Sequence, residues 1–288
     1  MSDVHELTPA EAAALVRVPT ADDDKYARGV LGLLTGSSRY PGAAVLGVEA
    51  ALRTGVGMVR YLGPARAAEL VLQRRPEAVT AEGRVQAWLI GSGMALLGAD
   101  ATGAAEEPSD TTTAERVRRA LASGHPLIID AGAIAPGVLE AATGPVIITP
   151  HAGELARLST TEVAAVCADP VTAARAVAER YGVAVLLKGH TTRAVAPGGP
   201  VLVARQAPAW LATAGAGDAL AGILGALTAT HAAVEAVDLA RLARLGAAAA
   251  VLHGLAATRA SAGGPLTVLD LCAALPATIA ELLGAAGR

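Results

Sequence analysis

The sequence predicts an α/β protein, a three-layer α/β/α sandwich with a mostly parallel central sheet. Short apolar runs of strand length alternate along the chain with longer segments rich in Ala, Leu and Arg. The apolar runs are continuous rather than alternating, as expected for strands that helices cover on both faces. Hydrophobic residues make up 53% of the 288 residues and charged residues only 17%, so the chain can form a large core and is not disordered.

Six apolar runs are expected to be the strands of this sheet. They are Val30–Leu34, Met58–Leu62, Ala87–Ile90, Leu127–Ile129, Val146–Ile148 and Val183–Leu187. Helix-like stretches lie between them, and their small side chains favour close packing on a sheet. These stretches are Ala43–Arg53, Ala65–Gln73, Ala114–Ala122 and Pro170–Tyr181.

After Gly217 the sequence predicts almost only helix, over Asp218–Thr230, Ala232–Ala260 and Asp270–Leu283. In the first half of Ala232–Ala260, apolar and charged residues alternate as in an amphipathic surface helix. The stretch Glu106–Thr113 is the most loop-like of the chain. Because no repeat or linker divides the sequence, we expect an N-terminal extension, residues 1–24, followed by a single domain, residues 25–288.

Composition and charge exclude several functions. A net charge of −3, a pI near 6.1 and six aromatic residues argue against nucleic acid as a partner. The longest uncharged run, Ala219–Val234, has 16 residues, fewer than the roughly 18–20 that cross a membrane. The acidic segment Met1–Glu11 does not resemble a signal peptide, and Cys167 and Cys272 lack metal or disulfide spacing. We therefore expect a cytoplasmic protein without a membrane partner.

Five of the predicted strands are followed by small, polar or charged residues. The segments are Thr35–Ala44, Gly91–Gly93, Asp130–Gly132, Thr149–Glu154 and Lys188–Thr192. In an open parallel sheet, ligands bind beyond the carboxyl ends of the strands. The five segments are expected to meet at that edge and to form a binding site.

Each segment taken alone also has an ordinary structural interpretation. The first is compatible with a plain strand-to-helix turn that uses Gly and a Ser cap. Gly91–Gly93 lacks a full dinucleotide fingerprint. A helix cap would explain Asp130, and a core position would explain His151. Their coincidence at one edge favours a functional site.

The segment Thr213–Asp218 opens a long apolar helix with the pattern Gly-x-Gly-Asp. Small residues let backbone N–H groups converge on an anion, and the helix N-terminus favours negative charge there by roughly 0.3–1 kcal/mol. The same field is expected to lower the pKa of Asp218 and keep it ionised. An ionised carboxylate beside a phosphoryl group can act as a general base, although a simple helix-start Asp is an equal alternative.

Lys188 favours the functional interpretation. Only two lysines, Lys25 and Lys188, stand among 23 basic residues, so a lysine at a strand end is unusual in this chain. A lysine binds phosphate as a compact point charge. Lys25 precedes the first strand, where it either faces the same pocket or belongs to a solvated charge cluster. His151 and Glu154 are spaced to face one site, with Glu154 a candidate for a water-mediated Mg²⁺ contact or a first-turn helix acid.

Four motifs occur in a characteristic order. They are Gly-Ser-Ser-x-Tyr-x-Gly-Ala-Ala at 36–44, Thr-Pro-His-x-Gly-Glu at 149–154, Leu-Lys-Gly-x-x-Thr at 187–192 and Gly-x-Gly-Asp at 215–218. Together they resemble the ADP-dependent NAD(P)H-hydrate dehydratases of the ribokinase-like superfamily. The resemblance covers the chain from about Lys25 onward and implies a stand-alone dehydratase domain, without the epimerase domain that many relatives carry.

The resemblance implies specific roles for residues at matching positions. Asp218 matches the catalytic base, and Ala43, Gly93, His151 and Asp218 match positions that contact the hydrated nucleotide. The positions that match nucleotide contacts are Lys188, Gly189, His190, Thr191, Thr192 and Gly217. The implied carbon–oxygen lyase reaction dehydrates the S epimer of NADHX or NADPHX with ADP as phosphoryl donor and Mg²⁺, releasing AMP and phosphate. The family also implies a homo-oligomer, with a tetramer favoured, and the Ala-rich C-terminal helices could pack at its interfaces.

The sequence departs from the family in the segment before Asp218. Gln206–Leu211 replaces a segment that usually contains Asn and Gly, Ala214 and Ala216 replace Gly and Thr, and the chain contains no Asn. Two alternatives therefore remain beside the dehydratase. One is a ribokinase-like, ATP-dependent kinase of a small alcohol or vitamin precursor, and the other is a nucleotide-binding protein without catalysis.

Overall fold

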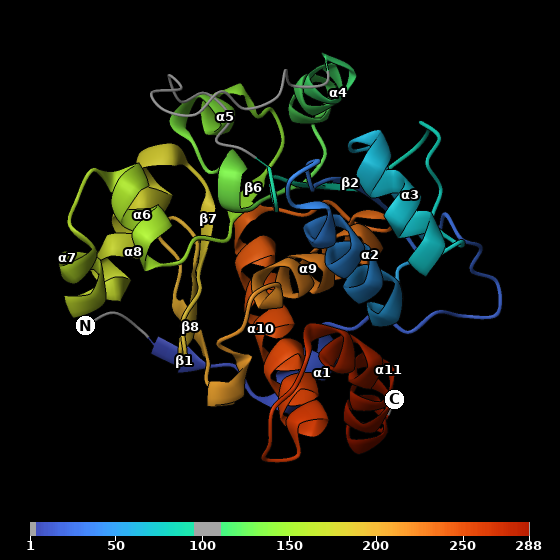
Figure 1. Cartoon of the computed structure of the whole chain (residues 1–288). Helices are drawn as coiled ribbons and strands as arrows, with labels where there is room; N and C mark the ends of the chain where they lie inside the picture. The colour runs from blue at the N-terminus through green and yellow to red at the C-terminus, as the bar shows by residue number, and fades with distance from the viewer. Residues whose placement is uncertain (1–3, 95–110, 288) are drawn as a thin grey trace.

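The structure, a computed structural model, describes residues 4–94 and 111–287. In this part of the chain a nine-stranded sheet separates two layers of helices, in the strand order β1-β9-β8-β7-β6-β5-β4-β2-β3 (Figure 1). Neighbouring strands are parallel except that β8 runs antiparallel to both β7 and β9. The expected α/β sandwich with a mostly parallel sheet is confirmed.

All six runs predicted as strands belong to the sheet. The strands are β1 (Val4–Glu6), β2 (Val30–Leu34), β3 (Met58–Tyr61), β4 (Ala87–Ile90), β5 (Leu127–Ile129), β6 (Val146–Ile148), β7 (Ala184–Leu187), β8 (Thr192–Val195) and β9 (Val201–Ala204). The sequence analysis did not identify β1, β8 or β9. The turn Pro197–Pro200, with Gly198 at φ +66°, is the hairpin signal between β8 and β9.

Alternate residues of each strand supply the two halves of the core. In β2, for example, Leu31 and Leu33 face one helical layer, and Val30 and Leu34 face the other. The first layer contains α1 (Pro9–Ala14), α2 (Pro41–Thr54), α3 (Ala65–Arg74), α9 (Ala216–Ala232), α10 (Leu239–Ser261) and α11 (Val268–Ala285). The second contains α4 (Thr111–Leu121), α5 (Pro136–Ala141), α6 (Ala152–Ser159), α7 (Val163–Ala168) and α8 (Pro170–Tyr181).

Helix α9 lies between α2 and α10 in the first layer (Figure 1). A Cβ built on Gly222 of α9 would lie 2.4 Å from the carbonyl oxygen of Gly47 in α2, so the two helix backbones are close enough to require glycine. This packing brings the N-terminal turns of α2 and α9 together at the carboxyl edge of the sheet.

The C-terminal helices differ from the prediction. Residues 233–238 connect two helices rather than forming the start of one, because the Asp238 side chain accepts a hydrogen bond from the Arg241 amide at 2.7 Å and begins α10. Val234 is exposed, whereas Leu242 and Leu245 are fully buried. The expected surface helix Ala232–Ala260 is therefore wrong in its first turns, and α10 is mainly a core helix.

Two other expectations involve segments at the edge of the described residues. Thr111–Thr113, expected to be loop, form the first turn of α4, and the rest of Glu106–Thr113 lies outside the described residues. Residues 4–16, expected to precede the domain, contribute β1 to the sheet and bury Leu7 against the first helical layer.

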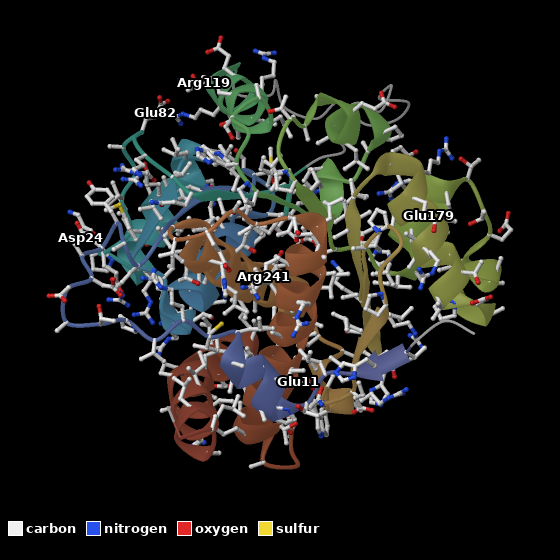
Figure 2. All side chains as sticks on the ribbon, turned by 180° about the vertical axis from the view of Figure 1, so that it is seen from behind. Glu11, Asp24, Glu82, Arg119, Glu179 and Arg241 are labelled. Carbon is white, nitrogen blue, oxygen red and sulfur yellow. The ribbon has the colours of Figure 1, made fainter. Side chains whose placement is uncertain are left out.

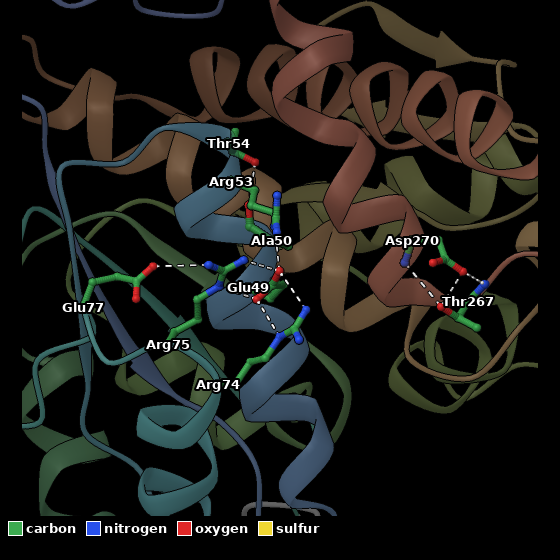
Figure 3. Close-up of polar contacts among 9 residues, drawn as sticks. All are labelled: Glu49, Ala50, Arg53, Thr54, Arg74, Arg75, Glu77, Thr267 and Asp270. Atoms are coloured by element: carbon green, nitrogen blue, oxygen red, sulfur yellow. Dashed lines mark hydrogen bonds and ion pairs between the residues drawn. The ribbon is translucent and has the colours of Figure 1, made fainter.

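Charged side chains such as Glu82 and Arg119 project from the outside of the fold and pair there at 2.9 Å (Figure 2). Some carboxylates lie inside, and Glu49 is one of them. Glu49 of α2 is fully buried and binds Arg53, Arg74 and Arg75, which tie α2 to α3 (Figure 3). Two helices, α10 and α11, are long and apolar enough to cross a membrane by length and composition, and most of α10 is buried inside the protein.

Candidate active site

The carboxyl ends of β4, β5 and β6 are level with one another. Ile90 pairs with Ile129, and Ile129 pairs with Ile148. The residues that follow these positions therefore lie beside each other at one edge of the sheet. Asp130, which follows β5, is only 2% exposed, so its carboxylate needs partners in place of water.

Hydroxyl and amine groups from three neighbouring strand ends supply those partners. The Oδ2 atom of Asp130 accepts a hydrogen bond from Ser92 Oγ at 2.7 Å. The Oδ1 atom accepts bonds from Thr149 Oγ1 at 2.6 Å and from Lys188 Nζ at 2.8 Å. Burial opposes ionisation of Asp130, but the charge of Lys188 and these hydrogen bonds outweigh it and lower the carboxyl pKa. We call these four residues the Asp130 network.

Gly91 makes room for this network. Its φ of +112° suits glycine, and a Cβ built there would lie 2.1 Å from the Asp130 carbonyl oxygen. A side chain at this position would push β5 away from β4.

Lys188 extends from the end of β7 to the turn before α9. Burial alone would lower the pKa of its amine, but the carboxylates of Asp130 and Glu154 raise it, so the side chain remains a cation. A Cβ built on Gly217 would lie 3.5 Å from Lys188 Nζ, which places the amine under the glycine-rich turn. The sequence-based expectation that this lysine lies beside the turn agrees with that geometry.

His151 and Glu154 form the first turn of α6 as a capping box. The ring Nδ1 of His151 accepts from the backbone amides of Gly153 and Glu154, and Glu154 Oε2 accepts from the His151 amide at 2.8 Å. Glu154 Oε2 also lies 3.9 Å from Lys188 Nζ. The first-turn role left open for Glu154 is therefore the one that the contacts support.

The surroundings of Glu154 do not fit a protein-held magnesium ion. A lysine ammonium already lies beside its carboxylate. Among residues 4–94 and 111–287, no group of three or more His, Cys, Asp or Glu side chains is arranged to hold a metal.

Asp218 lies in the first turn of α9, directly after the turn Gly215–Gly217. Its pKa is raised to about 7, first because the carboxyl group is buried and then because Asp130 carries a negative charge nearby, while Lys188 acts in the opposite direction. The expected lowering of this pKa by the helix N-terminus is wrong, because burial and the neighbouring carboxylate dominate. A carboxyl group that titrates near neutral pH is well suited to accept a proton.

Ala43 and Gly93 face each other across the ends of α2 and β4. A Cβ built on Gly93 would lie 2.6 Å from the Ala43 Cβ and 2.9 Å from the Tyr40 carbonyl oxygen. Gly93 follows Ser92 of the Asp130 network, and α2 packs on α9, which carries Asp218. Three of the expected substrate-contacting residues, Ala43, Gly93 and Asp218, thus lie on the adjoining elements α2, β4 and α9, whereas His151 lies at the start of α6.

A cavity of about 530 Å³ borders the glycine-rich turn at Ala216 and Gly217. It is lined by Lys188, Gly189, His190, Thr192, Ala204, Gln206, Ala207, Pro208, Ala209, Leu211, Ala212, Ala216, Gly217, Leu220, Ala250 and His253. Five of the six residues expected to contact nucleotide are among them. One wall includes residues of Gln206–Leu211, the segment in which the sequence departs from the dehydratases that it resembles.

Thr191, expected to contact the nucleotide, and Lys25, considered as a further residue of the same pocket, lie outside the cavity lining. The hydroxyl of Thr191 accepts a bond from Arg205 at 3.4 Å instead of facing the cavity. Lys25 lies before β2, at the opposite edge of the sheet, with its amine 5.4 Å from the centre of the Tyr26 ring. The solvated alternative for Lys25 is therefore correct.

The sequence analysis placed Ser92, Asp130 and Thr149 at this edge but offered only a helix cap for Asp130, and it did not identify His253. Asp130 has no capping hydrogen bond and instead organises its network with Ser92 and Thr149. An acid directly after a fully apolar strand was the available signal. His253 lines the cavity from α10, and burial lowers its pKa to about 4 even though the ring hydrogen-bonds the Ala216 backbone. A histidine within the apolar run 245–257 was its only sequence signal.

Comparisons with known proteins agree with this geometry. The family model described as NAD(P)H-hydrate dehydratase matches residues 31–275. The chain is 40% identical to the bifunctional NAD(P)H-hydrate repair enzyme Nnr of Mycobacterium leprae over 79% of the chain and 46% of that protein. It therefore spans about half the length of this bifunctional relative.

A shorter relative and a solved structure match more completely. The ADP-dependent (S)-NAD(P)H-hydrate dehydratase of Xanthomonas campestris is 34% identical over 74% of the chain and 76% of that protein. The crystal structure of the ADP/ATP-dependent NAD(P)H-hydrate dehydratase from Bacillus subtilis, co-crystallised with ATP and Mg²⁺, has a TM-score of 0.80 at 25% identity and covers 97% of this chain and 99% of that one. The predicted ribokinase-like α/β fold is confirmed by these matches. This chain belongs to the NAD(P)H-hydrate dehydratase family.

Proposed function

We propose that this protein dehydrates the S epimer of hydrated NADH or NADPH, with ADP as the phosphoryl donor. The reaction would transfer a phosphoryl group to the ring hydroxyl and release AMP. Loss of phosphate and of a neighbouring ring proton would then restore the double bond of NAD(P)H. The relatives from X. campestris and B. subtilis support both the substrate and the nucleotide.

The position of Asp218 is the observation that carries this proposal. The residue lies in the first turn of α9, directly after Gly217 of the lining of the cavity of about 530 Å³, and α9 packs on α2, which carries Ala43. A hydroxyl bound on one side and a phosphoryl group bound on the other would meet at this carboxylate. We assign Asp218 as the base that accepts the hydroxyl proton during phosphoryl transfer.

The cavity suits a nucleoside diphosphate. Lys188 and the small residues at Gly217 and Gly189 offer a cation and close backbone approach at one end. Ala207, Pro208 and Leu211 offer an apolar wall at the other end, as a base requires. Any Mg²⁺ would be carried by the phosphates rather than by Glu154, and we assign the metal no protein ligand.

The decisive experiment supplies hydrated NADH, ADP and Mg²⁺ and follows the return of NADH absorbance. We expect recovery together with equal amounts of AMP and phosphate. Replacing ADP with ATP tests the donor, because the altered wall at residues 206–212 borders the nucleotide. No recovery with either nucleotide would exclude the reaction.

The same assay separates the two alternatives from the dehydratase. A kinase of a small alcohol would convert ATP to ADP and leave a stable phosphate ester. A nucleotide-binding protein without catalysis would bind ADP by calorimetry and turn over neither substrate. The raised pKa of Asp218 favours a catalytic protein over this last alternative.

We further propose a homo-oligomer, with a tetramer favoured, in the cytoplasm. The exposed side of α11 presents small residues, including Ala273, Ala277 and Ala280, which would allow close packing of a second subunit. Cys167 and Cys272 are free, in keeping with a reducing compartment.

A further inference from the structure

Asp130 is a buried acidic residue at the carboxyl edge to which the proposed chemistry gives no task. It is almost fully buried, and its two oxygens bind side chains from the ends of three other strands, which contribute Ser92, Thr149 and Lys188. If Asp130 served only to hold the strands together, its side chain would not need a charge. Three neutral hydrogen bonds or an apolar contact would join the strands without the cost of burying an ion pair.

The negative charge of Asp130 matters because of the position of the Lys188 ammonium group. A flexible lysine has four side-chain carbons and many rotamers, and ordering them has an entropic cost. Asp130 holds the amine at 2.8 Å from one side, and Glu154 lies at 3.9 Å from another. The amine is thereby fixed under Gly217, where a side chain would come within 3.5 Å of Nζ.

We propose that Asp130 is a positioning residue that acts through Lys188, holding its ammonium group at the phosphoryl end of the nucleotide cavity. Ser92 and Thr149 orient the Asp130 carboxylate for this task. The inference rests on the proposed function in one respect only, that Lys188 contacts the phosphates of ADP.

A double-mutant cycle on ADP binding tests the inference. Asp130→Asn keeps the size of the side chain and one acceptor oxygen but removes the charge, and Lys188→Ala removes the amine. Each single variant is expected to weaken ADP binding about tenfold by calorimetry, since each loses a charge-assisted contact. If Asp130 acts through Lys188, the double variant binds ADP as Lys188→Ala does, within about twofold. Effects that multiply to about a hundredfold would overturn the proposal, as would unchanged binding in Asp130→Asn.

Two controls separate positioning from a loss of stability. Asp169→Ala removes an exposed side chain that caps α8 outside the site, so it should lower stability without changing ADP affinity. Thr149→Val removes one donor to the oxygen that binds Lys188 and serves if Asp130→Asn does not fold. It should weaken ADP binding a few-fold in the presence of Lys188 and not in the Lys188→Ala background. A loss of the same size in both backgrounds would contradict the inference.

The pH dependence of ADP binding gives a readout that a purely structural role would not change. Lys188 faces Asp130 from β5, Glu154 from α6, Asp218 from α9 and His253 from α10. Without the Asp130 charge, the buried amine should lose its proton at lower pH, so ADP affinity in Asp130→Asn should fall with rising pH in a range where wild-type affinity is constant. Wild type and Lys188→Ala should lack that fall, and the same pH profile in all three proteins would argue against the proposal.

The outcomes also distinguish this inference from the proposed reaction. If the wild-type protein binds ADP but regenerates no NADH, the proposed reaction is excluded. The double-mutant cycle on ADP binding would still test the role of Asp130. A wild-type protein that binds neither ADP nor ATP would overturn both.

Discussion

Asp130 and Asp218 are two aspartates at the same edge of one sheet, and their surroundings shift their pKa values in opposite directions. Asp130 has Lys188 and two hydroxyl donors, which lower its pKa despite burial. Asp218 has burial and the charge of Asp130, which raise its pKa to about 7. One carboxylate is therefore permanently charged, and the other can exchange a proton near neutral pH, a division of roles that acid–base chemistry requires.

Replacing Asp218 with Asn should lower turnover by about 10²–10⁴, because a general base contributes on that order. ADP binding, measured by calorimetry, should be largely retained. The variant should also raise the melting temperature at pH 8, since it removes a buried charge close to Asp130. Turnover at the wild-type rate would exclude Asp218 as the base.

The wild-type rate should depend on pH through the same group. Below about pH 7 Asp218 is protonated and cannot accept the hydroxyl proton, so kcat/KM should rise with pH and level off above the pKa of about 7. The linked effect on stability has the opposite sign. Because the folded pKa exceeds the ordinary value of 3.8, the contribution of Asp218 to folding weakens as pH rises from about 4 to about 7. If kcat/KM instead rose with pH around pH 4, the assignment of Asp218 as the base would be contradicted.

At the level of residues, the sequence predicted which side chains lie at the site better than it predicted their pKa values and hydrogen-bond partners. Lys188 and Asp218 could be identified because a lysine is rare in this chain and because the Gly-x-Gly-Asp turn is distinctive. The pKa of Asp218 could not, since its shift comes first from burial in the folded protein and then from Asp130, 88 residues earlier in the chain (218 − 130 = 88). Thr191 matched a family position, but Arg205, from beyond the unpredicted β9, lies beside its hydroxyl.

At the level of elements, two contacts of α2 fix the geometry of the site. One is the close approach of Gly47 to Gly222 in α9. The other is the group of arginines around Glu49, which joins α2 to the end of α3 (Figure 3). Both contacts hold the helix whose first turn carries Ala43.

Gly222→Ala should destabilise the protein by about 1–3 kcal/mol, because the added methyl group would overlap the Gly47 backbone. Urea denaturation measures the change. Gly137→Ala in α5 is the matched control, since a Cβ there meets nothing within 4 Å. That control should be neutral or stabilise the protein by up to about 1 kcal/mol. Equal effects of the two variants would show that the helices can separate without cost.

Glu49→Gln should lower the free energy of unfolding by about 2–3 kcal/mol at pH 7, because three partly exposed arginines lose a buried counter-charge. The pKa of Glu49 is lowered to about 2: burial opposes the shift, and the bonds from Arg75, Arg53 and Arg74 outweigh it. Its contribution should therefore be complete above the ordinary value of 4.5 and disappear as pH falls toward 2. Glu77→Gln, at an exposed pair 3.4 Å from Arg75, should change stability by less than about 0.5 kcal/mol.

The elements themselves were largely predictable, and the exceptions have physical reasons. Strands buried on both faces are continuous apolar runs, so β2 to β7 could be recognised. Strand β8 begins within the motif Leu187–Thr192, where the sequence suggests a loop, and β1 is a short exposed edge strand. Neither has the pattern of a core strand.

At the level of the whole molecule, the proposed oligomer should depend on α11. Wild type should elute well above the 28.5 kDa of one chain, and Ala277→Glu on the exposed side of that helix should shift the mass toward the monomer. Ala165→Glu, on α7 of the other helical layer, is the control and should leave the mass unchanged. A monomeric wild type at micromolar concentration would exclude the assembly.

The pairing of β1 with β9 has a consequence for folding. Val4 pairs with Val201, so the segment 4–16 can take its place only after a stretch of 197 residues has been brought into position (201 − 4 = 197). Closing so long a loop is slow, and the edge of β9 stays open to other strands in the meantime. Refolding should therefore complete the active-site edge before the segment docks, and a bulky fusion ahead of residue 4 would act on that last step rather than on the site.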